Sequence, residues 1–103
     1  MSSSVKILPE DKVQLTQDQK NLIELAFIKQ VPSEDAEFME KVQKEKGEDS
    51  YSKLSEYFTN KYGVDFGTIY LSAIIGGKEK YEEAVELIEK TRAEERIKNL
   101  QKN

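Results

Sequence analysis

Tyr57 and Lys61 are the two residues of this chain whose types and spacing come closest to a known active site. Some nicotinamide-dependent reductases use a Tyr-x-x-x-Lys pair, and the sequence has that spacing here. Such a site also needs a glycine-rich turn between a strand and a helix to hold the dinucleotide. The chain contains no such turn, so we interpret the pair as a chance match.

Two further short patterns match known sites in spacing alone. The stretch SYSK at 50–53 has the Ser-x-x-Lys spacing of penicillin-recognising enzymes, but the larger fold and the other motifs of those enzymes are missing. We interpret it as a helix cap followed by a surface lysine. The stretch GGK at 76–78 is too short for a phosphate-binding loop and indicates a break between helices.

The residue types that most enzymatic and metal chemistry requires are absent. The chain has no His and no Cys, which removes the commonest general base, the commonest transition-metal ligand and every thiolate site. Acidic clusters at 34–40 and 79–86 could meet Ca²⁺ weakly, but no calcium loop of alternating acids around a glycine occurs. We therefore predict that the protein is not an enzyme and has no catalytic residue, metal site or cofactor.

The composition favours a single soluble domain. A chain of 103 residues is near the commonest domain size. Its formal net charge of −4 and pI near 5.0, with basic and acidic residues interleaved, argue against a nucleic-acid partner. No stretch approaches the roughly 20 apolar residues of a membrane span or resembles a signal peptide, so we expect no membrane contact and a cytoplasmic location.

The spacing of apolar residues predicts an all-α fold, a compact bundle of four to five short helices. An N-terminal tail or extended segment covers 1–15, and a single helical domain covers 16–103, with a longer C-terminal helix whose turns at 93–103 are candidates for fraying. Caps and breakers place the helices at 17–30, 33–46, 50–61, 66–75 and from 78 onward.

The helices at 17–30, at 50–61 and from 78 onward have apolar faces that we expect to be buried against the helix at 66–75. The face of the helix at 50–61 comprises Leu54, Tyr57 and Phe58. The second helix instead begins with acidic residues at 34–37, which the helix dipole favours and which we expect on a solvated face. The apolar face of the first helix comprises Leu22, Ile23, Leu25, Ala26, Phe27 and Ile28. The stripe of the last helix comprises Tyr81, Ala84, Val85, Leu87 and Ile88, and it continues more thinly through Ala93, Ile97 and Leu100, where it could pair with a partner helix.

Residues 62–77 carry one charge, Asp65, in a chain rich in charge. We predict that the helix at 66–75 is mostly buried, because a helix that is apolar nearly all round is central in its domain. The alternative is a helix-turn-helix DNA-binding regulator built from 53–75, but its second helix lacks the Arg, Lys, Asn and Gln that contact bases and phosphates. The DNA-contacting residues under this alternative are Lys61, Thr68, Tyr70, Ser72 and Lys78.

Aromatic residues concentrate between 51 and 70, and tyrosine outnumbers phenylalanine in the chain. Because tyrosine can bury its ring while its hydroxyl stays hydrated or paired, this balance favours a recognition surface. We therefore predict a small protein-binding module, an adaptor, accessory or inhibitor protein whose partner is another protein. A structural, self-associating subunit that forms a homo-oligomer is the third hypothesis. If the tyrosines lie on the surface, Tyr57→Glu or Tyr62→Glu should remove binding and leave melting nearly unchanged. The predicted interaction residues are Tyr51, Tyr57, Tyr62, Tyr70, Ile97 and Leu100.

Overall fold

The computed structural model describes residues 5–45 and 47–101. In this part of the chain a short 3-10 helix precedes four α-helices, so the all-α prediction is confirmed, and the last helix is the longest. Among the described residues, no helix combines the length and the apolar character that crossing a membrane requires. The elements are η1 (Pro9–Asp11), α1 (Gln17–Phe27), α2 (Ser33–Glu45), α3 (Ser50–Tyr62) and α4 (Val64–Gln101). Residue 46, at the predicted end of the second helix, lies outside the described residues.

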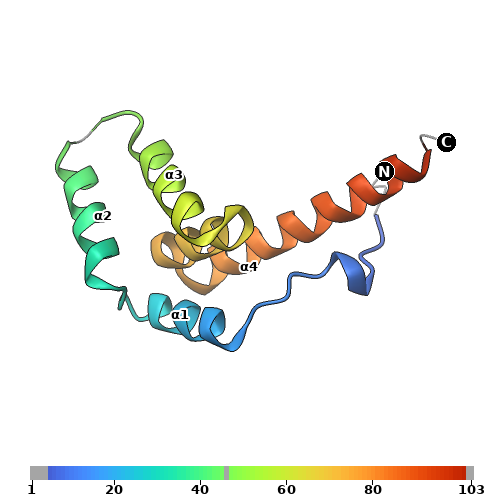
Figure 1. The fold of residues 1–103 in the computed structure, drawn as a ribbon, viewed down its shortest axis with the longest axis horizontal. Helices are drawn as coiled ribbons and strands as arrows, with labels where there is room; N and C mark the ends of the chain where they lie inside the picture. The colour runs from blue at the N-terminus through green and yellow to red at the C-terminus, as the bar shows by residue number, and fades with distance from the viewer. Residues whose placement is uncertain (1–4, 46, 102–103) are drawn as a thin grey trace.

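Helix α4 is the element against which most of the others pack (Figure 1). Both α1 and α3 lie against its first half, α2 contacts α3, and η1 lies beside its second half. The second half projects from the group formed by α1, α2 and α3. This projection explains a radius of gyration of 15.7 Å, compared with roughly 13 Å for a globular domain of about 100 residues.

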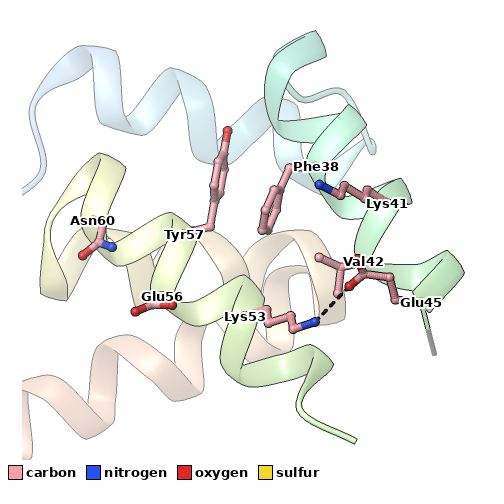
Figure 2. Close-up of a pocket in the computed structure, with 8 residues that line it drawn as sticks. All are labelled: Phe38, Lys41, Val42, Glu45, Lys53, Glu56, Tyr57 and Asn60. Carbon is pink, nitrogen blue, oxygen red and sulfur yellow. Dashed lines mark hydrogen bonds and ion pairs between the residues drawn. The ribbon is translucent and has the colours of Figure 1, made fainter. Parts of the chain in front are cut away.

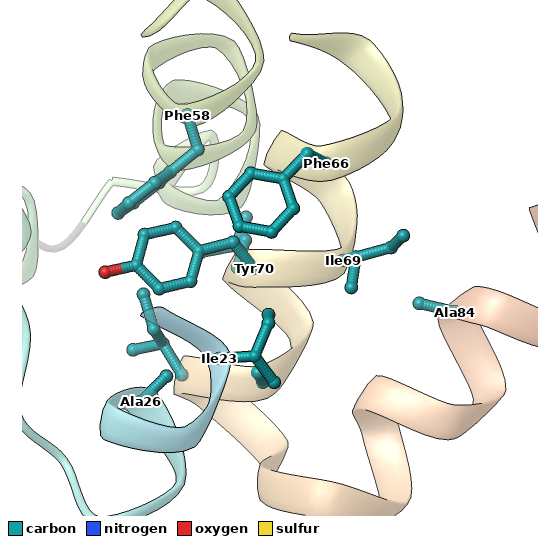
Figure 3. Packing of buried hydrophobic residues seen from close by; sticks show 10 residues of the cluster. Ile23, Ala26, Phe58, Phe66, Ile69, Tyr70 and Ala84 are labelled. Carbon is teal, nitrogen blue, oxygen red and sulfur yellow. The ribbon is translucent and has the colours of Figure 1, made fainter. Parts of the chain in front are cut away.

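The prediction that residues 66–75 form the buried centre is confirmed. Ile69, Tyr70 and Ala73 have no exposed surface. The Tyr70 ring lies between the aromatic rings of α3 and α4 and the side chains of α1 (Figure 3). Its centroid is 5.7 Å from that of Phe58 and 5.5 Å from that of Phe66. Because α1 and α3 both bury their apolar faces on this one segment, its lack of charge follows from its central position.

Helix α4 bends at Gly77, where we expected a break between two helices. The φ of 73° and ψ of −158° at this residue lie in a region that is essentially restricted to glycine. The bend interrupts the helical hydrogen bonds, so carbonyl groups before it need other donors. Lys29 supplies one, because its Nζ donates to the Ile74 carbonyl oxygen at 3.0 Å.

Three apolar residues that we predicted to be buried are exposed. Helix α1 ends at Phe27 instead of residue 30, because Lys29 adopts a left-handed conformation with φ of 63°. Ile28 then lies beyond the helix and is 62% exposed, and Leu25 in the last turn of α1 is 42% exposed. Leu87 is 65% exposed because the projecting half of α4 is covered on one side only.

Gly67 allows α4 to approach α3 closely. A Cβ atom at this position would lie 2.5 Å from the backbone carbonyl oxygen of Phe58. We expect Gly67→Ala to lower the free energy of unfolding by about 2 kcal/mol, because the two backbones must separate. The loss should occur although alanine is favoured over glycine by about 1 kcal/mol in an open helix.

The neighbouring substitution Thr68→Ala is the control for Gly67→Ala. The Thr68 hydroxyl donates to the Val64 carbonyl of its own helix at 2.9 Å, so its removal should change stability little. Urea denaturation followed by circular dichroism measures both variants. Equal stability of the wild type and Gly67→Ala would contradict the close approach of the helices.

Candidate protein-interaction site between α2 and α3

Asp35, in the first turn of α2, is completely buried, whereas the sequence led us to expect it on a solvated face. Its carboxylate accepts hydrogen bonds from the Tyr57 hydroxyl and from Lys61 Nζ, each at 2.7 Å, and from the Tyr62 hydroxyl. Burial of a carboxylate requires such compensation. All three donors lie near the end of α3, so one carboxylate fixes the start of α2 against α3.

The electrostatics of this cluster favour an ionised pair, Asp35 and Lys61, and neutral side chains at Tyr57 and Tyr62. Burial by itself would raise the pKa of Asp35, but the hydrogen bonds from Lys61, Tyr62 and Tyr57 outweigh it and hold that pKa below its ordinary value. The pKa of Lys61 is raised, chiefly by its hydrogen bond to Asp35 and then by the one to Glu34. Burial, and then the bond to Asp35, raises the pKa of Tyr62. Near neutral pH the cluster therefore keeps its ion pair.

A groove of about 360 Å³ lies next to this cluster, between the facing sides of α2 and α3 (Figure 2). The rings of Phe38 and Tyr57 stack there with centroids 4.1 Å apart and 9° between their planes. Val42, which is 3% exposed, extends the apolar part of the lining. The lining residues are Phe38, Lys41, Val42, Glu45, Lys53, Glu56, Tyr57 and Asn60.

Charged contacts hold the two helices together beside this groove. The Asp35 cluster includes Tyr57, which lines the groove, and Lys53 and Glu45 form an ion pair at 2.9 Å between the same two helices (Figure 2 shows the ion pair). The side chains of Lys53 and Glu45 are each 44% exposed, so this pair contributes little stability by itself. The ion pair instead helps to position the two helices, because it links the end of α2 to the start of α3 across the connecting loop.

The structure brings together three of the predicted interaction residues, Tyr57, Tyr62 and Tyr70, but only Tyr57 lines the groove. The rings of Tyr62 and Tyr70 meet edge to face with centroids 5.0 Å apart. Tyr70 has no exposed surface, and its hydroxyl has no hydrogen-bond partner within the described residues. Burial raises the pKa of Tyr70 to about 12. In this conformation Tyr70 cannot contact a partner directly.

The other predicted interaction residues lie away from the groove. Tyr51 is 60% exposed and lines a separate pocket with Ile75. Ile97 is half-buried and Leu100 is exposed, both on the projecting half of α4. The prediction missed Phe38 as a site residue, although a sequence signal was present. Phe38 and Val42 are four residues apart and therefore share one face of α2.

The five residues of the DNA-binding alternative do not form one exposed ridge. Tyr70 is buried, and Lys61 is held by two carboxylates. The hydroxyl of Thr68 donates within its own helix, Ser72 is half-buried and Lys78 is exposed. A base-reading helix must present donors and cations together on one accessible face. The geometry therefore does not favour this alternative.

The structure also changes our expectation for Tyr57→Glu and Tyr62→Glu. Both tyrosine hydroxyls donate to Asp35. A glutamate at either position would replace a donor with a second negative charge beside a buried carboxylate. These variants should therefore lose stability, and they cannot separate binding from folding.

Asp35→Asn tests the cluster through its pH dependence. The pKa of Asp35 is lowered on folding, so its contribution to stability is present above the unfolded-state pKa and is lost as pH falls through the folded-state pKa. We expect Asp35→Asn to reduce the free energy of unfolding by about 2 kcal/mol at about pH 7, and the difference from wild type to shrink below about pH 4. Urea denaturation from about pH 7 to about pH 3 measures this.

Glu37→Gln is the matched control for Asp35→Asn, since Glu37 is an exposed acid in the same helix. It should follow the wild-type curve throughout. A constant difference between wild type and Asp35→Asn across the whole pH range would contradict the proposed role of the carboxylate.

Comparison of the chain with protein families, with curated proteins and with solved structures finds no match in any of the three.

Proposed function

We propose that this protein is a small helical protein-binding module without enzymatic activity, and that it contacts its partner through the α2–α3 groove. The observation that carries this proposal is the stacked pair Phe38 and Tyr57 in an open groove with charged residues along its edges. An apolar, aromatic centre surrounded by a polar rim is the usual anatomy of a protein–protein interface.

The aromatic pair is held in place before a partner arrives. The Tyr57 hydroxyl donates to Asp35, and its ring is stacked on Phe38 on one side and meets Phe58 edge to face, with centroids 5.1 Å apart, on another. A side chain that is already ordered loses little conformational entropy on binding. This preorganisation favours Tyr57 and Phe38 as the central contacts of the interface.

The size of the groove indicates what a partner inserts. A volume of about 360 Å³ is at the small end of the range for ligand pockets, which is suited to one or two apolar side chains. Lys41 and Glu56 on opposite edges offer contacts of both signs. An amphipathic helix that presents one apolar anchor between polar residues has this chemistry.

The hydrogen bonds and the pKa shifts of Tyr57 and Lys61 support a non-enzymatic role. Tyr57 OH and Lys61 Nζ are 3.5 Å apart, but both also bond to Asp35. Burial, and then the bond to Asp35, raises the pKa of Tyr57, and the pKa of Lys61 is raised as well. A general acid or base works best with a pKa near the operating pH, and these shifts move both groups away from it.

Phe38→Ala tests the groove, and Met39→Ala is its matched control. Both residues are half-buried on α2, but Phe38 lines the groove, whereas Met39 lines a different pocket. A partner is first isolated from host extract with the wild-type chain, and its affinity is then measured with purified components. We expect Phe38→Ala to weaken binding by about 30-fold or more, as for a central interface residue, and Met39→Ala to weaken it less than about threefold.

Circular dichroism of both variants checks that they remain folded. Equal loss of binding in the two variants, or full binding by Phe38→Ala, would place the interface elsewhere. Sedimentation of the wild type at several concentrations separates a different partner from self-association. If the chain forms a dimer that Phe38→Ala disrupts, the hypothesis of a self-associating subunit replaces the proposal that the groove binds a different protein.

A further inference from the structure

Residues 5–15, which we call the strap, lie along the projecting half of α4 (Figure 1). The strap runs antiparallel to the helix. The Val13 N–H donates to the Glu89 carboxylate at 3.0 Å, and towards the other end the Lys6 carbonyl accepts from Arg96 at 3.1 Å. The contacting residues of α4, which we call the α4 stripe, share one face of the helix and are Glu89, Arg92, Ala93 and Arg96.

Asp11 is the centre of this contact and is 3% exposed. Arg96 donates to both of its carboxylate oxygens, from Nε at 3.3 Å and from a terminal guanidinium nitrogen at 2.9 Å. This bidentate arrangement is the specific geometry of arginine with a carboxylate. The same carboxylate accepts from the Leu8 N–H at 2.9 Å, so the bound aspartate also closes the turn of η1. Ala93, which lies between the two arginines on α4, has no exposed surface.

Arg92 contacts the backbone of the strap. It donates to the carbonyl oxygens of Asp11 at 3.5 Å and Lys12 at 3.2 Å, and another of its nitrogens pairs with Asp65 at 2.5 Å. Backbone contacts do not depend on which side chains the bound segment carries. The α4 stripe therefore selects for an extended segment through Arg92 and Glu89, and for one aspartate through Arg96.

The strap is held in a way that permits exchange. Within the strap, Asp11 has the only side chain that is fully buried, and Val5, Ile7 and Leu8 are half-buried. Val13 and Leu15, at the end next to α1, are also half-buried and pack against the hydrophobic core. The net free energy of a buried ion pair is close to zero once the cost of dehydration is included. The part of the strap before Val13 is held mainly by polar contacts, and such a segment belongs to the parts of a protein that open most easily.

We propose that the α4 stripe is a binding site for an extended segment of a partner protein that carries an aspartate in a tight turn, and that the strap occupies this site in cis. The two arginines and the carboxylate supply the charge complementarity on which this assignment rests. It differs from our expectation that Ala93 and its neighbours pair with a partner helix, since an extended segment covers this residue. The site is distant from the α2–α3 groove and does not depend on the function proposed for it.

The test uses a fluorescein-labelled peptide with the sequence of residues 5–15 and measures anisotropy with the full chain. In the full-length variant Asp11→Asn the strap loses its bond to Arg96 and competes less. We expect the peptide to bind this variant at least about tenfold more tightly than it binds the wild type. Adding Arg96→Gln should abolish binding of the peptide, whereas adding Lys98→Gln, at an exposed position on the same helix, should leave it unchanged.

Failure of the peptide to bind Asp11→Asn, or binding that survives Arg96→Gln, would overturn the proposal. A second measurement uses no variant, so it does not depend on a variant's folding. Millimolar peptide added to the wild type should shift the NMR amide signals of 89–96, and unchanged signals would also overturn the proposal. If the wild type alone forms a dimer that Arg96→Gln disrupts, the occupant is the strap of a second copy, which overturns the assignment to a partner protein.

Discussion

Two buried aspartates, Asp35 and Asp11, attach α2 and the strap to the rest of the fold. Each meets one long cation, Lys61 or Arg96, together with further hydrogen-bond donors. Breaking such a pair by removing one partner is costly, although forming it contributes little net free energy. Each ion pair therefore fixes the position of the element that carries its aspartate. For α2 and for the strap, only one register gives the carboxylate its hydrogen-bond donors, and any other register leaves a charge without partners.

The groove follows from the register that Asp35 sets. Residues three apart on a helix share a face, so the turn that directs Asp35 at the end of α3 also directs Phe38 at Tyr57. The stacked pair is then a product of the same contact that buries the charge. This explains why the tyrosines divide into two classes. Tyr57 lines the groove, whereas Tyr70 is completely buried in the core.

The features of the fold that composition alone determines could be predicted from the sequence. The helix at 66–75 could be predicted as buried because almost all of its residues are apolar, so no choice of neighbours changes the result. Leu87 and Ile28 were mispredicted because their exposure depends on which side of a helix another element covers. Asp35 is a favourable charge in the first turn of a helix, which is consistent with the dipole, and no residue near Arg96 in the sequence indicates its partner. Their actual partners lie 26 and 85 residues away in sequence, and local patterns carry no information at that range.

The shape of α4 lets a short chain offer two separate surfaces. Its first half is covered by α1 and α3 and carries the core, whereas its second half is an edge covered by the strap. The bend at Gly77 lies between the halves and sets the direction in which the second half leaves the bundle. The groove and the α4 stripe share no side chain, and energetic coupling between distant sites requires an element with two arrangements that both sites influence. Under the two proposals, the groove and the α4 stripe lie on opposite sides of the bend at Gly77, so each can be altered by substitution without removing a contact of the other.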